Sequence, residues 1–144
     1  MMLQTDAVLR ARADLAAELE RREAFPLLDA WLVPCGNRPV WTREEWIDKF
    51  RALGYREDGW VSAPTDQDFM FRGCRFEDRE GLSWTPSYSL AAWFARRCDG
   101  EVYVVLGIPA ERLLARIGPT YADRQTGPAV EFVVDVRGLE TRLV

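Results

Sequence analysis

The chain has 144 residues, of which 48% are hydrophobic, and its formal net charge of −4 comes without a single histidine. This is the length of one ordinary domain, and the apolar content excludes a disordered chain. The missing histidine excludes His-dependent nucleophile triads and ordinary His-containing zinc sites, and the negative charge disfavours a nucleic-acid partner.

The N-terminus lacks the basic-then-apolar pattern of a signal peptide, and no apolar run approaches the roughly 20 residues that a membrane-spanning helix needs. Three widely separated cysteines, Cys35, Cys74 and Cys98, argue against a disulfide framework and for a reducing compartment. We therefore expect a cytoplasmic protein without membrane contact.

Residues 1–53 are predicted to form a helical N-terminal part. The first helix covers residues 3–24 and ends or is interrupted at Pro26. Its periodicity gives one apolar face, formed by Val8, Leu15, Ala16 and Leu19. Whether these helices line a cleft, bind a partner or only cover a sheet stays open.

A short apolar stretch, residues 27–33, stops at the turn-forming residues 34–37. Thr42 and Glu45 have the spacing of a capping box and open a further helix that ends near Gly54. Its apolar face is formed by Trp46, Ile47, Phe50 and Leu53. Polar residues with glycine and proline predict a loop over 55–67.

The second half of the chain changes to a period of two, which is typical of strands. A helix from Pro86–Ser87 to about Arg97 is expected to bury Leu90, Ala91, Trp93 and Phe94. The other expected elements are strands at 68–76, 82–85, 101–108 and 129–136, a helix at 110–117 and a loop at 118–127. Helices first and strands later predict a single α+β domain over residues 1–144.

Three polar positions stand out among these apolar strands. Arg72 interrupts an aromatic strand just before Gly73, and Glu131 interrupts a strand of valines. Ser83 shares one side of a short strand with a second hydroxyl, just before a helix begins.

Each of these positions has an ordinary alternative. Arg72 would be an edge arginine in an ion pair, and Glu131 an outward-facing carboxylate. In the Ser83 segment, Thr85 would cap the helix and Trp84 would be a core residue.

In this order, the segments Phe71-Arg72-Gly73, GLSWT with the following AAWFA helix, VYVVLGIPAERLLA and VEFVVDV form a longer pattern. Over residues 68–136 it resembles the R-S-E branch of the ADP-ribosyltransferase superfamily, and most closely its small phage and bacterial members. The resemblance implies split antiparallel sheets around a cleft for NAD+, which is the substrate, and no metal.

The resemblance also implies roles for individual residues. Arg72 would bind a phosphate or ribose of the dinucleotide, and Ser83 would hydrogen-bond the nicotinamide ribose. Glu131 would hold the ribose 2′-hydroxyl and stabilise the oxocarbenium-like transition state. Further NAD+-binding positions are Gly73, Trp84, Thr85, Tyr88 and Phe94, with Tyr88 or Phe94 stacking on the nicotinamide ring.

The chain departs from the pattern two residues before Glu131, where many members carry an acceptor-orienting Glu or Gln and this chain has Ala129. Residues of the preceding loop, Tyr121, Arg124 or Gln125, are candidates to replace it, and the equal alternative is a flexible surface loop without such a role.

We expect a mono-ADP-ribosyltransferase that modifies a protein, such as a phage or bacterial effector or toxin. The alternatives are an NAD+ glycohydrolase, and an inactive relative that binds a host protein.

Overall fold

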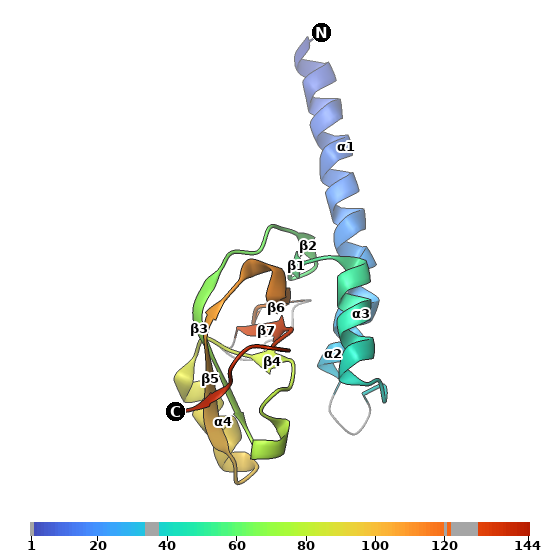
Figure 1. Ribbon diagram of the computed structural model, residues 1–144. Helices are drawn as coiled ribbons and strands as arrows, with labels where there is room; N and C mark the ends of the chain where they lie inside the picture. Colours follow the sequence, from blue (N-terminus) through green and yellow to red (C-terminus); the bar gives the residue numbers. More distant parts are fainter. Residues whose placement is uncertain (1, 34–37, 120, 122–129) are drawn as a thin grey trace.

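The computed structural model describes residues 2–33, 38–119, 121 and 130–144, with side chains from Thr5 onward. Within these ranges the chain is a mixed α+β structure with two β-sheets, as the order of the predicted elements indicated. The helical elements come first, and the strands and α4 form a separate mass beside them (Figure 1).

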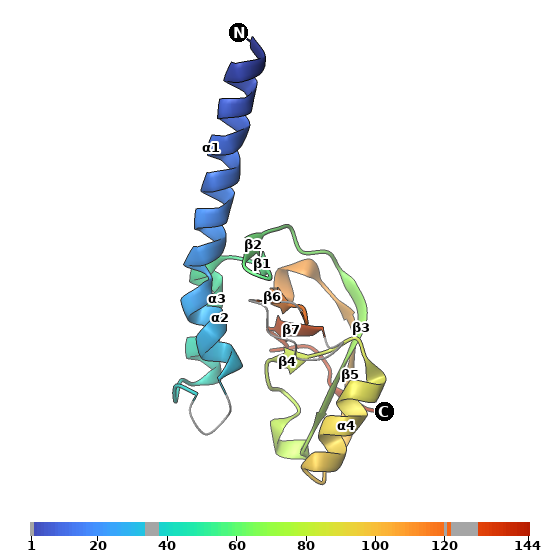
Figure 2. The ribbon, with the colours of Figure 1, turned by 180° about the vertical axis from the view of Figure 1, so that it is seen from behind.

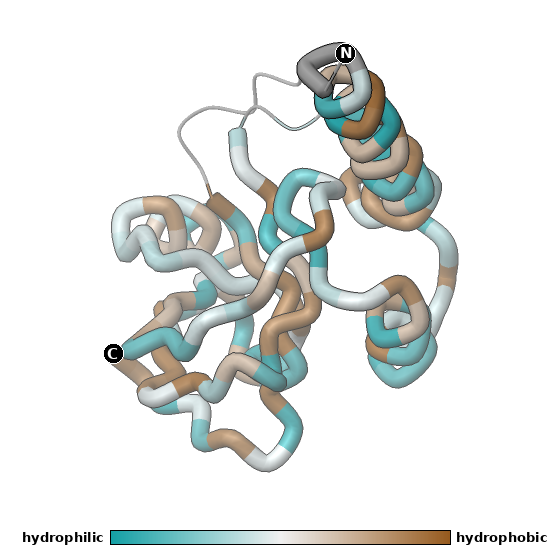
Figure 3. Tube along the Cα trace, turned by 90° about the horizontal axis from the view of Figure 1, so that it is seen from above, coloured by the Kyte–Doolittle hydropathy of each residue, from teal (hydrophilic) through white to brown (hydrophobic). Residues whose placement is uncertain are grey.

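Helix α1 (Met2–Glu23) extends away from the other described elements and meets them at its C-terminal end (Figures 1 and 2). Its predicted apolar face is largely uncovered, since Val8, Leu15 and Leu19 are each more than half exposed. Seen from above, the trace of this helix alternates between hydrophobic and hydrophilic residues (Figure 3). Among the described residues, no helix combines the length and apolarity needed to cross a membrane.

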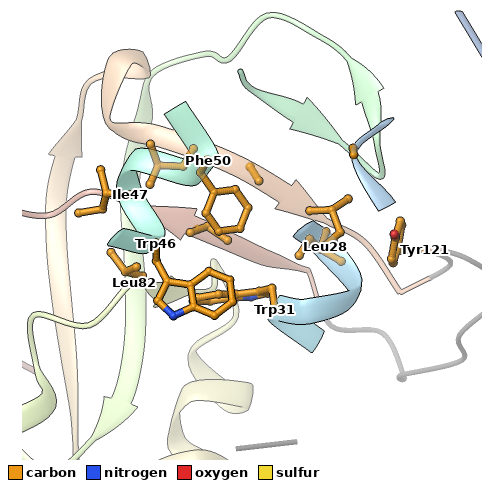
Figure 4. Close-up of a cluster of buried hydrophobic side chains, with 12 residues drawn as sticks. Leu28, Trp31, Trp46, Ile47, Phe50, Leu82 and Tyr121 are labelled. Carbon is orange, nitrogen blue, oxygen red and sulfur yellow. The ribbon is translucent and has the colours of Figure 1, made fainter. Parts of the chain in front are cut away.

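Helices α2 (Phe25–Leu32) and α3 (Arg43–Leu53) behave differently from α1, because both bury an apolar face. The predicted capping box is confirmed: the Thr42 hydroxyl accepts from the Glu45 backbone N–H at 3.1 Å, and the Glu45 carboxylate accepts from the Thr42 backbone N–H at 3.3 Å. The buried side chains form an aromatic-rich core over the first sheet (Figure 4), with Leu28, Trp31, Trp46, Ile47, Phe50, Leu82, Tyr121 and Val133 among its members.

The first sheet has the strand order β2-β1-β6-β7-β4 and the second β3-β5-β8. The bounds of the first are β1 Arg56–Glu57, β2 Trp60–Val61, β4 Ser83–Trp84, β6 Leu113–Ile117 and β7 Glu131–Val134; those of the second are β3 Gln67–Cys74, β5 Glu101–Ile108 and β8 Arg142–Leu143. Strand β1 runs parallel to β6, and every other pair among the described strands is antiparallel.

The two sheets meet where β4 ends. Phe71 of β3 and Thr85 exchange two backbone hydrogen bonds, at 2.8 and 2.9 Å, in an isolated antiparallel bridge. The segment 83–85 therefore belongs to one sheet at its start and touches the other at its end. A second core lies between the sheets and contains Met70, Trp84, Val105, Ile108, Phe132 and Val134.

The helix predicted over residues 110–117 is wrong. Only Ala110–Arg112 form a helical turn, of the 3-10 type, and Leu113–Ile117 form strand β6. This strand lies between β1 and β7, so pairing on both edges overrides the helix-favouring leucines and alanine of its sequence. The region predicted as a loop at 55–67 contains strand β1, which forms because Arg56 and Glu57 pair with β6.

Helix α4 (Tyr88–Arg97) is capped by Ser87, whose hydroxyl accepts from the Leu90 backbone N–H at 3.2 Å. The expectation that it buries Trp93 and Phe94 is wrong, since these side chains are 43% and 48% exposed. The buried stripe is formed by Ala91 and Ala95, because α4 lies so close to β3 that only small side chains fit between them.

Candidate functional site

The three predicted catalytic residues form a continuous chain of contacts. The Ser83 hydroxyl donates a hydrogen bond to Oε2 of Glu131, and Arg72 Nη1 donates to the Ser83 backbone carbonyl at 3.0 Å. Ser83 is the first residue of β4, Glu131 is the first of β7, and Arg72 lies in β3. The junction of the two sheets thus brings together side chains that lie up to 59 positions apart in sequence.

Strand register explains the contact between Ser83 and Glu131. Ser83 is paired with Val133, so Glu131, two residues earlier on β7, lies diagonally opposite on the same face. Val133 on that face is fully buried in the core under α2 and α3. Glu131 therefore points to the helical side of the sheet and is half-buried, rather than lying on an outer sheet surface.

A fourth group holds the carboxylate, and the sequence analysis did not find it. The indole Nε1 of Trp31, in α2, donates to Oε1 of Glu131 at 2.7 Å. Each carboxylate oxygen thus accepts one hydrogen bond from the protein. No spacing rule joins residues 31 and 131, and residues 27–33 are identified from the sequence only as a short apolar stretch.

The Arg72 guanidinium is held by the loop that follows β3. Besides its contact with the Ser83 carbonyl, Arg72 donates from Nε to the Asp78 carbonyl at 2.9 Å. Gly81 leaves room for the group, since a Cβ at that position would lie 2.3 Å from Arg72 Nη2. The carbonyl groups of Asp78 and Ser83 thereby hold two donors of the guanidinium, Nε and Nη1.

Three predicted NAD+-binding residues, Arg72, Gly73 and Phe94, line a surface cavity of about 370 Å³. Its remaining lining residues are Cys74, Arg75, Asp78, Arg97 and Cys98, so two arginines that the sequence analysis did not select also border it. Ser83 and Glu131 do not line this cavity; they are joined to it through Arg72. A concave, arginine-rich cavity suits an anionic ligand.

Gly73 has two structural properties at this cavity. A Cβ there would lie 1.8 Å from the Ala91 carbonyl oxygen, so α4 can approach β3 only over a glycine. Because backbone groups of a strand alternate between its edges, Gly73 directs its N–H and C=O to the edge that Phe71 uses for Thr85. This edge of β3 continues past the bridge into the cavity.

Other predicted NAD+-binding residues lie elsewhere. Trp84 is 1% exposed and packs between the two sheets, with its indole donating to the Gly81 carbonyl at 2.8 Å, so the prediction that it contacts a ligand is not supported. Thr85 is buried at the sheet junction, and its hydroxyl accepts from the Ser87 backbone N–H at 3.1 Å. Tyr88 is half exposed and packs edge-on against Phe71 rather than in the cavity.

Most of the residues considered for orienting an acceptor lie outside the described part of the chain. This holds for Ala129, Arg124 and Gln125. Tyr121 is described, and the structure buries its side chain instead of presenting it at the surface. It is 1% exposed, packs edge-on against Phe25 and donates its hydroxyl proton to Asp29 at 3.2 Å.

Within the described ranges, no group of three or more His, Cys, Asp or Glu side chains is placed to hold a metal ion. Comparisons with protein-family models, with curated proteins and with solved structures found no match to this chain. The interpretation of the site therefore rests on its own geometry.

Proposed function

We propose that the chain is an NAD+-dependent mono-ADP-ribosyltransferase with an ADP-ribosyltransferase-like fold, acting on a protein acceptor. The observation that supports this most is the hydrogen bond from the Ser83 hydroxyl to the Glu131 carboxylate, with Arg72 on the Ser83 carbonyl. Two strands from distant parts of the sequence place a fixed anion, a hydroxyl and a guanidinium in one line of contacts.

This set of groups suits cleavage of the bond between nicotinamide and ribose. The bonding electron pair leaves with nicotinamide, which departs as a neutral molecule and needs no general acid. Positive charge develops on the ribose, and the Glu131 carboxylate, held by two donors, stabilises that charge. A nucleophile of the acceptor then bonds to the anomeric carbon and loses its proton to Glu131 or to solvent.

The cavity supplies binding groups for the same substrate. Arg72, Arg75 and Arg97 border it and offer planar donors for a diphosphate. The backbone edge at Gly73 offers a donor and an acceptor of the kind that the nicotinamide carboxamide requires. Phe94, which is about half exposed at the cavity wall, offers a ring for stacking.

An NAD+ glycohydrolase is the second candidate, because the position two residues before Glu131 is occupied by Ala129. A methyl group there cannot orient an acceptor side chain, which leaves water as the acceptor. Both candidates use the same first step and the same carboxylate.

The first experiment incubates the pure protein with NAD+ and measures nicotinamide release, with and without a cell lysate. We expect Glu131→Gln to lower the release rate about a hundred- to a thousandfold while the fold is retained, because the fixed charge is lost. Glu140→Gln is the matched control, since Glu140 is an exposed carboxylate whose partner is Arg142.

Transfer of labelled ADP-ribose to a lysate protein supports the transferase, and release without transfer supports the glycohydrolase. A Glu131→Gln protein that keeps full activity removes Glu131 from the proposed chemistry. Wild-type protein that releases no nicotinamide under either condition overturns both candidates.

A further inference from the structure

Trp31 connects the helical N-terminal part of the chain to the proposed catalytic carboxylate. Its indole N–H is 2.7 Å from Oε1 of Glu131, and its side chain is only 4% exposed. A hydrogen bond from a buried donor to a charged acceptor is among the stronger ones in proteins, and here water does not compete for the buried donor.

The surrounding aromatic rings fix the direction of this N–H. Trp46 lies edge-on to Trp31, with 5.2 Å between ring centroids and 83° between ring planes, and Phe50 lies edge-on at 5.7 Å and 81°. These rings come from α3 and are themselves buried, as Figure 4 shows. In such a packed core the Trp31 ring cannot turn without displacing its neighbours.

Arg38 holds the same tryptophan from another side. Its guanidinium carbon lies 4.6 Å from the centroid of the Trp31 ring, and its Nη2 donates to the Trp31 backbone carbonyl at 2.5 Å. This contact adds a cation–π interaction and ties the C-terminal end of α2 to the following segment.

We propose that Trp31 is a positioning residue for Glu131: its indole N–H fixes one carboxylate oxygen while Ser83 fixes the other. In its kinetic part, this inference rests on the proposed function. A carboxylate held at both oxygens keeps one orientation toward the developing charge, which a freely rotating carboxylate does not. The N-terminal helices are then part of the site rather than a cover for the sheet.

The test compares Trp31→Phe with Trp41→Phe in the full-length chain. Both variants keep an aromatic ring and lose similar volume at one cluster, but only Trp31→Phe removes the donor to Glu131. The ring of Trp41 contacts that of Trp46, with 4.5 Å between centroids, rather than that of Trp31. For Trp31→Phe we expect kcat for nicotinamide release to fall about tenfold, with KM for NAD+ nearly unchanged. Trp41→Phe is expected to keep kcat within about twofold of wild type.

A second measurement does not depend on activity or on the stability of Trp31→Phe. In ¹⁵N-labelled protein, assigned through backbone and side-chain correlations, the indole N–H resonances of Trp31 and Trp46 are followed in wild type and Glu131→Gln. We expect Glu131→Gln to shift the Trp31 resonance clearly more than the Trp46 resonance, because only Trp31 donates to the altered group.

The two measurements separate the two claims. Equal shifts of the Trp31 and Trp46 resonances overturn the inference, and so does equal kcat in the two tryptophan variants of an active enzyme. A selective Trp31 shift in a protein that releases no nicotinamide supports the contact with Glu131, while it is the proposed function that fails.

Discussion

The two ends of the line Arg72–Ser83–Glu131 are built in opposite ways. At the Glu131 end, both carboxylate oxygens accept from protein donors, and the adjoining Val133 is buried under α2 and α3. At the Arg72 end, the guanidinium borders a surface cavity, and the cavity wall includes the half-exposed ring of Phe94. The Glu131 end has the fixed geometry that a catalytic step requires, and the Arg72 end has donors that remain open to a ligand.

The largest effect on stability that we predict comes from Gly73→Ala, at the open end. The added Cβ would lie 1.8 Å from the Ala91 carbonyl oxygen and 2.7 Å from the Ala95 backbone nitrogen, so α4 must move away from β3. We expect a loss of about 3 kcal/mol in unfolding free energy, measured by urea denaturation.

Gly81→Ala is the control for this prediction. Its Cβ would meet the end of the Arg72 side chain, 2.3 Å from Nη2, and a side-chain end can shift where a backbone cannot. We expect this variant to lose about 1 kcal/mol. Equal stability of the two variants would contradict the close packing of α4 on β3.

The packing of α4 shows what periodicity in a sequence can and cannot predict. The helix itself and its start were predictable from Pro86 and Ser87, but its buried face was not, because Trp93 and Phe94 are more apolar than the alanines that are buried. The deciding fact is the absence of a side chain at Gly73, on another element. In the same way, α1 has an apolar stripe whose exposure no local pattern indicates.

The next largest effect is expected for Arg72→Lys, which keeps the charge but loses the planar fork. Lysine cannot reach both the Asp78 and Ser83 carbonyls and also face the cavity, so the donor set is broken. We expect KM for NAD+ to rise about thirtyfold, equivalent to about 2 kcal/mol, with a smaller change in kcat.

Arg79→Lys tests whether any arginine of this loop would behave the same way. Arg79 donates to the Phe76 carbonyl and stacks on the Phe76 ring, and it does not line the cavity. Its substitution is expected to leave KM within about twofold of wild type. A similar rise in both variants would mean that the loop, rather than the fork of Arg72, controls binding.

Arg72, Ser83 and Glu131 stand out in the sequence as polar positions near apolar strands, but each has an ordinary alternative, and only the resemblance groups the three into one site. Trp31 does not stand out, because a tryptophan in an apolar helix indicates burial and gives no information on where its N–H points. The arginines at 75 and 97 were equally hidden, since surface arginines are common in this chain and only the fold brings them to one cavity.

A smaller effect is expected at the support of the fixed end, where Asp135 follows β7. Asp135 is 3% exposed and accepts from Arg137 Nε and Nη2, each at 2.9 Å, while Arg51 of α3 lies 3.5 Å away. Burial by itself would raise the pKa of Asp135, but the hydrogen bonds and charge of Arg137, aided by Arg112, outweigh it and hold the pKa below its usual value.

A lowered carboxyl pKa stabilises the fold above the unfolded-state pKa of about 3.9, and this stabilisation is lost as the pH falls through the folded-state pKa. We therefore expect the unfolding free energy of Asp135→Asn at pH 7 to be about 1.5 kcal/mol below that of wild type, as measured by urea denaturation. As the pH is lowered, the unfolding free energy of Asp135→Asn should fall less than that of wild type. Asp68→Asn, at an exposed carboxylate, is the control. A wild-type protein and Asp135→Asn with parallel pH profiles would contradict this role.

The smallest effect is expected for the alkylation rates of the two cysteines that line the cavity. This measurement tests whether NAD+ binds at the open end. Burial raises the pKa of Cys74, with Arg72 opposing it, whereas Cys98 is half-buried at the same cavity. Iodoacetamide is therefore expected to modify Cys98 before Cys74, and saturating NAD+ should slow the reaction at Cys98 roughly fivefold, as followed by peptide mass spectrometry. Nicotinamide alone, which lacks the diphosphate, should protect much less. If NAD+ leaves the Cys98 rate unchanged, Arg75 and Arg97 do not contact the bound dinucleotide, and the open end would have to bind something other than the proposed substrate, whose developing charge Glu131 would stabilise.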